Sequence, residues 1–263
     1  GDVKNMVSQE LQNRIAEYAE RSRAGMVEEL KALVRIPSVS RAGADGLPFG
    51  RACAQVLEEA LRLAEGHGLT AQSCGGYYGL AQYGAGDKTI GLFSHLDVVP
   101  EGNNWINSPY EPVEKDGLLI GRGVADNKNA AVVSMYVMKA FRELGLPLRS
   151  KISLFLGCSE ETGMEDIDRF VAEQPMPDFS IVPDASFPVC HGEKGIFSCE
   201  ARCKAPWQQL RSLTGGTVGN MVPDSASAVL PAEAGLLARL EEAAARAEGI
   251  TVAAAGGEIT VSA

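Results

Sequence analysis

The stretch TIGLFSHLDVVP, residues 89–100, decides how the fold is interpreted. It begins as an apolar run that predicts a buried strand over 89–94, and it ends with His95 and Asp97. Residues i and i+2 of a strand point to the same face, so both polar side chains emerge together where the strand leaves the sheet. Open α/β sheets bind their ligands at this edge. From this stretch alone, an equally good interpretation is that His95 and Asp97 only form a hydrogen bond with each other at the end of the strand and bind no ligand.

Strands and helices alternate through most of the chain. Apolar spacing predicts one helix or two in series over 8–35, an amphipathic helix over 50–65, and a helix that follows the Gly-punctuated turn at 121–123. Further helices are predicted over 165–173 and 231–248, and strands over 70–74, 80–83, 151–158, 179–184, 191–203, 250–253 and 258–261. The alternation predicts an α/β sandwich with a mostly parallel central sheet. The composition changes near Gly195, which predicts a second, smaller α+β unit.

Composition excludes several classes of partner. The 263 residues include 24 Lys and Arg against 34 Asp and Glu, and the formal net charge of -10 disfavours binding to nucleic acid or to an anionic membrane. Six dispersed cysteines without a C-x-x-C pair predict reduced cysteines in the core. The N-terminal residues are polar and helical, and no apolar run of about 18 residues occurs, so we expect a soluble, cytoplasmic protein.

Acidic or imidazole groups follow several predicted strands and turns. They are His95 with Asp97, Asp126, Glu160 with Glu161, and Asp184. We expect them to converge at one edge of the sheet, where so many carboxylates require compensating cations. One His with several carboxylates suits Zn²⁺ or Mn²⁺ better than Ca²⁺. The pair Glu160–Glu161 taken alone is more simply a solvated acidic turn, while His191 is expected at the surface or in packing and His67 in a polar loop.

Six blocks then carry a resemblance to a known family. They are SHLDVVP, GRGVADNKNA, SEETGMED, PDFSIVPDASFP, GEKGI and GGTVGNMVPD, in order along residues 10–263. In order and spacing the chain resembles the dinuclear-zinc exopeptidases, which include PepV-type dipeptidases, carnosinases, glutamate carboxypeptidases and succinyl-diaminopimelate desuccinylases. The PepV-type branch is the most similar. The resemblance implies a zinc-peptidase-like three-layer sandwich over residues 1–194 and the start of an α+β lid domain over 195–263.

The resemblance also implies a role for each site residue. His95 and Asp184 would bind one metal, Asp126 would bridge two metals, and Glu161 would bind the second. Asp97 would orient His95, and Glu160 would act as the general base. Asn220 would bind the C-terminal carboxylate of a small peptide with a free N-terminus. The expected cofactor is two Zn²⁺ ions, with Mn²⁺ or Co²⁺ as alternatives.

Two departures from the family pattern affect these expectations. The family often has Asp-Asp-Lys-Gly where this chain has Asp126-Asn127-Lys128-Asn129, and we expect little effect of Asn127 because that position does not bind metal. We also expect a non-proline cis peptide between Asp126 and Asn127. Family members continue beyond this chain with a lid histidine and a final metal-binding histidine, so we expect the 263 residues alone to be incomplete and inactive.

The function predicted from these residues is that of a metal-dependent dipeptidase. An N-acyl amino acid deacylase or desuccinylase of the same family is one alternative. A catalytically inactive metal-binding fragment is another, which the missing histidines favour. The oligomeric state and the preferred substrate side chains are left open by the sequence.

Overall fold

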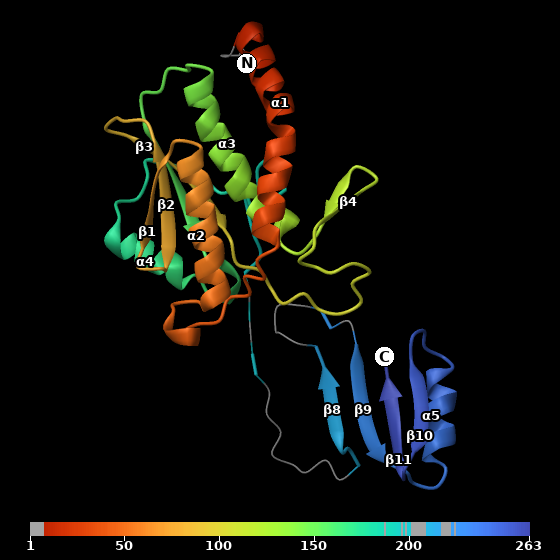
Figure 1. Cartoon of the computed structure of the whole chain (residues 1–263). Coiled ribbons are helices and arrows are strands. Elements are labelled where there is room, and N and C mark those ends of the chain that lie inside the picture. Colours follow the sequence, from red (N-terminus) through yellow and green to blue (C-terminus); the bar gives the residue numbers. More distant parts are fainter. Residues whose placement is uncertain are drawn as a thin grey trace. The chain divides into compact units, whose positions relative to one another are not determined.

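The computed structural model describes residues 8–186, 188–195, 197, 199–200, 209–216, 222–223 and 225–263 (Figure 1). The helices are α1 (Gln9–Val34), α2 (Arg51–Gly66), α3 (Asn129–Glu143), α4 (Glu165–Glu173) and α5 (Leu236–Ala244). The strands are β1 (Thr70–Cys74), β2 (Tyr78–Tyr83), β3 (Thr89–His95), β4 (Val113–Lys115), β5 (Leu118–Ile120), β6 (Lys151–Gly157), β7 (Phe179–Ile181), β8 (Ser212–Gly215), β9 (Ala226–Pro231), β10 (Thr251–Ala255) and β11 (Glu258–Ser262). The contacts divide the chain into two units, Gly1–Glu101 with Trp105–His191, and Gly102–Asn104 with Gly192–Ala263.

Unit 1 is built on a five-stranded sheet in the order β1-β2-β6-β3-β7. Strand β3 pairs in parallel with β6 on one side and with β7 on the other. Strand β2 runs antiparallel to both β1 and β6, so it is the one strand of this sheet that is reversed. This arrangement confirms the mostly parallel central sheet, and it pairs the end of β3 with β6.

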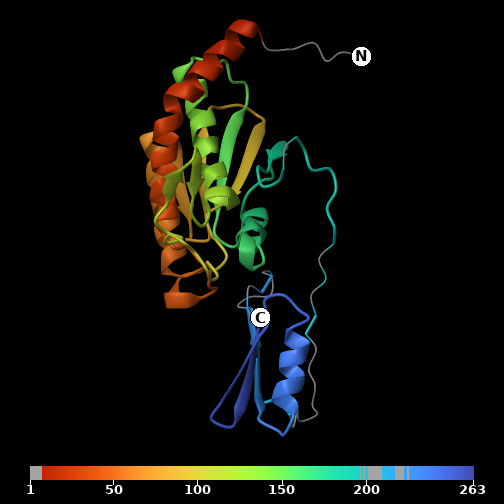
Figure 2. The same cartoon turned by 90° about the vertical axis from the view of Figure 1, so that its right-hand side faces the viewer.

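Helices cover both faces of this sheet (Figure 2). Ile152, Leu154 and Leu156 of β6 face the core shared with α1, α2 and α3, while Phe155 points to the other face and packs against Phe170 of α4. This alternation is the period-2 pattern of a strand that is buried on both sides. The three-layer sandwich predicted from the sequence is therefore confirmed.

Helix α1 is a single helix rather than two in series. The Oγ of Ser8 accepts a hydrogen bond from the N–H of Leu11, which caps the first turn. The helix ends before Pro37, and its residues Leu33 and Val34 are fully buried against the sheet core. This end of α1 matters for the site, because a lysine near Asp126 binds its last carbonyls.

Unit 2 contains a four-stranded antiparallel sheet in the order β10-β11-β9-β8, with α5 against β10. The predicted helix over 231–248 is wrong at both ends, because α5 covers only Leu236–Ala244. Pro231 is the last residue of β9, which pairs with β11, and α5 begins only after Gly235, whose φ of 76° is non-helical.

Two further predictions are wrong, and one hairpin was not predicted. The predicted strand over 191–203 is absent from the described residues of that segment, which pair with no strand of any sheet. Residues 113–120 form the unpredicted hairpin β4–β5, whose turn uses Asp116 and Gly117 at φ values of 52° and 77°, as a two-residue hairpin requires. The described cysteines are free thiols as expected, but Cys190 and Cys199 are exposed rather than in the core.

The environment of His67 also differs from the prediction. It follows α2 as its C-cap residue, with 5% of its surface exposed, and its Nε2 lies 2.8 Å from the Oε2 of Glu29. Packing against α1 and α3 thus buries a side chain that the local sequence assigns to a polar loop. Within the described part of the chain, no helix is long and apolar enough to cross a membrane.

Candidate metal and catalytic centre

Strand β3 delivers His95 to the carboxyl end of the central sheet. His95 is the last residue of the strand and lies opposite Gly157 of β6. The next residue continues the link, since the N–H of Leu96 donates to the carbonyl of Gly157 at 2.8 Å. Pairing with β6 therefore fixes the backbone of His95, and only 4% of the surface of this residue is exposed.

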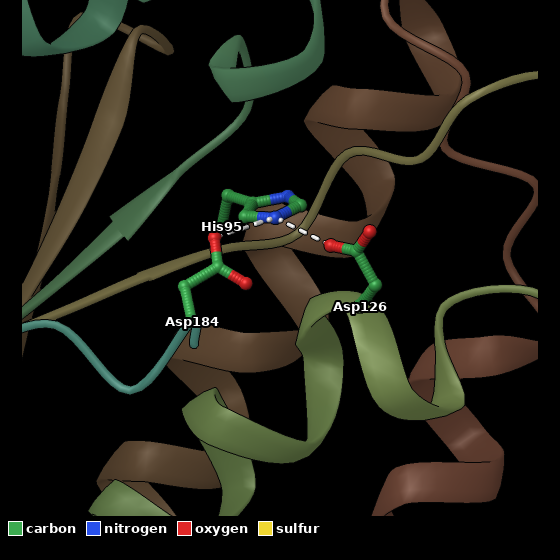
Figure 3. Close-up of side chains that lie close together, drawn as sticks. All are labelled: His95, Asp126 and Asp184. Atoms are coloured by element: carbon green, nitrogen blue, oxygen red, sulfur yellow. Dashed lines mark hydrogen bonds and ion pairs between the residues drawn. The ribbon is translucent and has the colours of Figure 1, made fainter. Parts of the chain in front are cut away.

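The two ring nitrogens of His95 have different surroundings (Figure 3). Its Nδ1 lies 3.0 Å from the carbonyl oxygen of Asp97 and 3.4 Å from the Oδ1 of the same residue. Its Nε2 lies 3.0 Å from the Oδ1 of Asp126 and 3.5 Å from the Oδ2 of Asp184. Because Nδ1 donates to Asp97, Nε2 is the atom directed to the other two carboxylates. This is the orientation that a carboxylate behind a metal-binding histidine produces.

Asp126 reaches this point from the turn before α3. Gly123 has a φ of 84°, and a Cβ there would lie 2.8 Å from the side chain of Val98, so the turn requires glycine. The peptide bond between Asp126 and Asn127 is cis, as predicted. Lys128 follows within the π-helical turn Val124–Lys128 and is fully buried.

Lys128 ties this turn to the end of α1. Its Nζ donates hydrogen bonds of 2.9 Å to the carbonyl oxygens of Leu33 and Ile36. The first carbonyl belongs to the last turn of the helix and the second to the second residue beyond it, where a cation is favourable. Burial lowers the pKa of Lys128 to about 8. No role was predicted for Lys128 from the sequence, because its carbonyl partners lie about 90 residues earlier in the chain.

Glu160 and Glu161 lie on the short 3-10 turn Glu160–Thr162 after β6. Their backbone N–H groups donate to the carboxylate of Asp97 at 3.3 and 3.1 Å. Asp97 is fully buried, and it therefore positions the glutamate turn as well as the imidazole of His95. The predicted orienting role of Asp97 thus extends to a second segment.

Asp166 holds the same turn from the other side, and the sequence analysis missed it. Its Oδ2 accepts from the N–H groups of Cys158 and Ser159 at 2.6 and 2.9 Å, and its Oδ1 accepts from Ile167 at 2.8 Å. A Cβ at Gly157 would lie 2.5 Å from that Oδ2, so the glycine makes room for the carboxylate. An acidic residue in the first turn of a helix was the available signal.

The charges in the cluster shift one another's ionisation. Burial alone would lower the pKa of His95, but the hydrogen bond to Asp97 and the charges of Asp97, Asp184 and Glu160 outweigh it and raise the pKa to about 9. Burial, followed by the charges of Asp126 and Glu160, raises the pKa of Glu161 to about 7. The pKa of Glu160 is also raised, first by burial and then by Asp184, Asp97 and Asp126. Negative charge is thus in excess at this point, which a bound cation would relieve.

The donor atoms fit a divalent metal. Among the described residues, His95, Asp126 and Asp184 form the group whose ligand atoms all lie within 4.8 Å of one another. An imidazole nitrogen with carboxylate oxygens is a donor set for Zn²⁺ and its neighbours in the transition series. Glu161 lies outside this group of three, and Asn220 lies outside the described residues.

A pocket adjoins the cluster. It has a volume of about 300 Å³ and brings His95, Glu160 and Asp184 together with apolar side chains. Those side chains include Phe93, Phe155, Met164, Ile167 and Val182. Glu160, the predicted general base, therefore faces the same space as two of the three candidate ligands. His191, in contrast, is exposed.

Comparison with known proteins identifies relatives of this arrangement. YtjP of Bacillus subtilis (strain 168) is 30% identical over 218 residues, which are 80% of this chain and 47% of that protein. The Beta-Ala-Xaa dipeptidase of Lactobacillus delbrueckii subsp. lactis is 33% identical over 187 residues, 70% of this chain and 40% of that protein. The chain thus spans about half the length of the curated relatives it matches.

Solved structures and the family match agree with the sequence relatives. The structure of human carnosine dipeptidase 1 aligns with a TM-score of 0.56 at 24% identity, covering 66% of this chain and 41% of that one. Residues 91–260, which contain His95, Asp126, Glu160, Glu161 and Asp184, match the peptidase family M20/M25/M40. The chain therefore belongs to the peptidase family M20/M25/M40.

Proposed function

We propose that this chain is part of a metal-dependent dipeptidase. The observation that carries the proposal is the convergence of His95, Asp126 and Asp184 at the carboxyl end of the sheet, with Glu160 in the adjoining pocket. Membership of a peptidase family and similarity to a Beta-Ala-Xaa dipeptidase support the same activity. The net charge of -10 argues against nucleic acid as a partner, and a cytoplasmic location stays a prediction from the sequence.

The proposed ligands divide between two metal ions. His95 and Asp184 would hold one ion, Glu161 would hold the other, and Asp126 would be a ligand of both. Zn²⁺ is the metal that we propose, with Mn²⁺ or Co²⁺ as alternatives. Such ions, when bound, supply Lewis acidity that polarises the substrate carbonyl and lowers the pKa of water. Asp97 keeps the Nδ1 of His95 protonated, so that Nε2 is the nitrogen available for binding.

Glu160 is the proposed general base. Its carboxylate takes a proton from the attacking water and later delivers that proton to the nitrogen of the leaving amine. A raised pKa suits both steps, because a group that takes and then returns a proton works best with a pKa near the working pH. Glu160 reaches the pocket because Asp97 and Asp166 fix the turn on which it lies.

The proposed substrate is a small peptide with a free N-terminus, whose C-terminal carboxylate would bind Asn220. The apolar wall formed by Phe93, Met164 and Val182 could receive an uncharged side chain beside the scissile bond. An N-acyl amino acid is the alternative substrate class within the same chemistry. A difference in rate between the two classes therefore separates the two activities.

The test starts from purified protein of measured intact mass, with excess Zn²⁺ or Mn²⁺ and a panel of dipeptides and N-acyl amino acids. A protein of the relatives' length that carries these residues should hydrolyse the dipeptides, and the 263-residue chain should bind metal. Glu160→Gln should lower turnover by about 10²- to 10⁴-fold while leaving metal content unchanged. Faster hydrolysis of the N-acyl amino acids would identify a deacylase, and a chain that takes up no metal would refute the site.

A further inference from the structure

Asn127 lies between the two segments that carry Asp126 and Asp184. It follows Asp126 directly and is fully buried. We propose that Asn127 is a positioning residue that fixes the Asp184 carboxylate for metal binding, an inference that rests on the proposed metal site. Little effect of an asparagine is expected from the sequence, because this position is not a metal ligand, whereas the structure gives the side chain a contact with a candidate ligand.

Asn127 forms a hydrogen bond with one carboxylate oxygen of Asp184 and leaves the other oxygen directed to His95. The Nδ2 of Asn127 donates to the Oδ1 of Asp184 at 2.5 Å and to the carbonyl oxygen of Pro183 at 3.2 Å. The other carboxylate oxygen of Asp184, Oδ2, lies 3.5 Å from the Nε2 of His95. One oxygen is therefore hydrogen-bonded, and the other is held toward the remaining ligands.

The amide chemistry fixes which end of Asn127 faces Asp184. Both hydrogens of Nδ2 have acceptors, one on the ligand itself and one on the backbone immediately before it. The Oδ1 of Asn127 is buried without a hydrogen-bond partner in the described part of the chain. With the amide reversed, Oδ1 would face a carboxylate oxygen and a carbonyl oxygen, and both contacts would be repulsive. The donor end of the side chain is therefore the functional one.

This contact also restrains the chain around Asp184. Asp184 lies three residues after the end of β7, beyond the pairing that fixes the strand. Two hydrogen bonds from one buried side chain hold residues 183 and 184 against the Asp126 turn, 57 residues earlier in the sequence. Hydrogen bonds of this kind to a ligating carboxylate typically change metal affinity by about 10- to 100-fold.

The experiment measures Zn²⁺ affinity of the 263-residue chain by competition with a chromophoric chelator. Asn127→Leu keeps most of the side-chain volume but removes the donor, and Asn127→Ala removes both. We expect each to raise the Kd for Zn²⁺ by about 10- to 100-fold. The matched control is Asn129→Ala at the first residue of α3. The Oδ1 of Asn129 accepts from the N–H of Ala130, not from a candidate ligand, so this variant should change the Kd for Zn²⁺ by less than about twofold.

A double-mutant cycle separates positioning from general damage to the fold. If Asn127 acts through Asp184, then Asn127→Leu should cause no further loss of Zn²⁺ affinity in an Asp184→Ala background. Thermal unfolding with a chelator present checks that each variant folds. If Asn127→Leu does not fold, Asn127→Ala replaces it in the cycle. An unchanged Kd in Asn127→Leu, or an equal loss in both backgrounds, would overturn the inference alone. A wild-type chain that binds no Zn²⁺ would overturn the proposed site and the inference together.

Discussion

Replacing Asp166 by alanine should strongly destabilise unit 1. The carboxylate accepts the N–H groups of Cys158 and Ser159, two residues that each have 1% of their surface exposed. Each buried donor left without an acceptor costs about 1–3 kcal/mol, so the two together amount to about 2–6 kcal/mol. Loss of the hydrogen bond from the N–H of Ile167 adds to this cost. Asp166→Asn keeps one oxygen in place of Oδ2 and should cost only about 1–2 kcal/mol, for the single bond to Ile167.

Urea unfolding followed by circular dichroism measures these differences. Asp168→Ala is the matched control, because Asp168 lies on the same helix with an exposed side chain and should change the free energy of unfolding by less than about 0.5 kcal/mol. Hydrogen exchange of the Cys158 and Ser159 amides provides a local measurement of the same effect. If Asp166→Ala unfolds within about 1 kcal/mol of the wild type, or if Asp166→Asn is no milder, then these backbone bonds do not hold the glutamate turn.

Two further predictions use ionisation. The pKa of His95 is about 9, so below that pH a metal ion must displace a proton from Nε2. The affinity for Zn²⁺ should therefore fall about tenfold for each pH unit between pH 8.5 and pH 7. An affinity that stops changing with pH already above pH 7 would show that His95 has an ordinary pKa. The pKa of Lys128 is about 8 in the folded chain, whereas its ordinary value is 10.5. The unfolded chain therefore keeps this proton to a higher pH than the folded chain does. The free energy of unfolding should consequently rise by up to about 3 kcal/mol between pH 8 and pH 10.5. Lys128→Met should lack this rise, and unfolding curves of the two proteins across that range would show equal slopes if the reasoning is wrong.

The edge of the sheet at which the site forms was predictable from local pattern. The apolar run over 89–94 predicts the strand, and the polar residues that follow it predict where the strand ends. Both predictions need only consecutive residues, because burial and side-chain alternation are local properties of a strand. The same reasoning located Asp126, Glu160 and Asp184 at the ends of other elements. It failed for residues 231–235, which were predicted to be helical, because Pro231 pairs with Glu258 of β11 and α5 begins only after Gly235.

The supporting residues depended on contacts between distant segments. Lys128 binds carbonyls at Leu33 and Ile36, His67 pairs with Glu29, and the amide of Asn127 reaches Asp184. No local pattern reports such pairs, because a buried polar side chain is tolerated only where the folded chain supplies its partner. The sequence by itself therefore determined which segments end in the candidate metal ligands. Only the tertiary structure decided how those groups are oriented, since orientation follows from hydrogen bonds that exist once the sheet has brought the segments together.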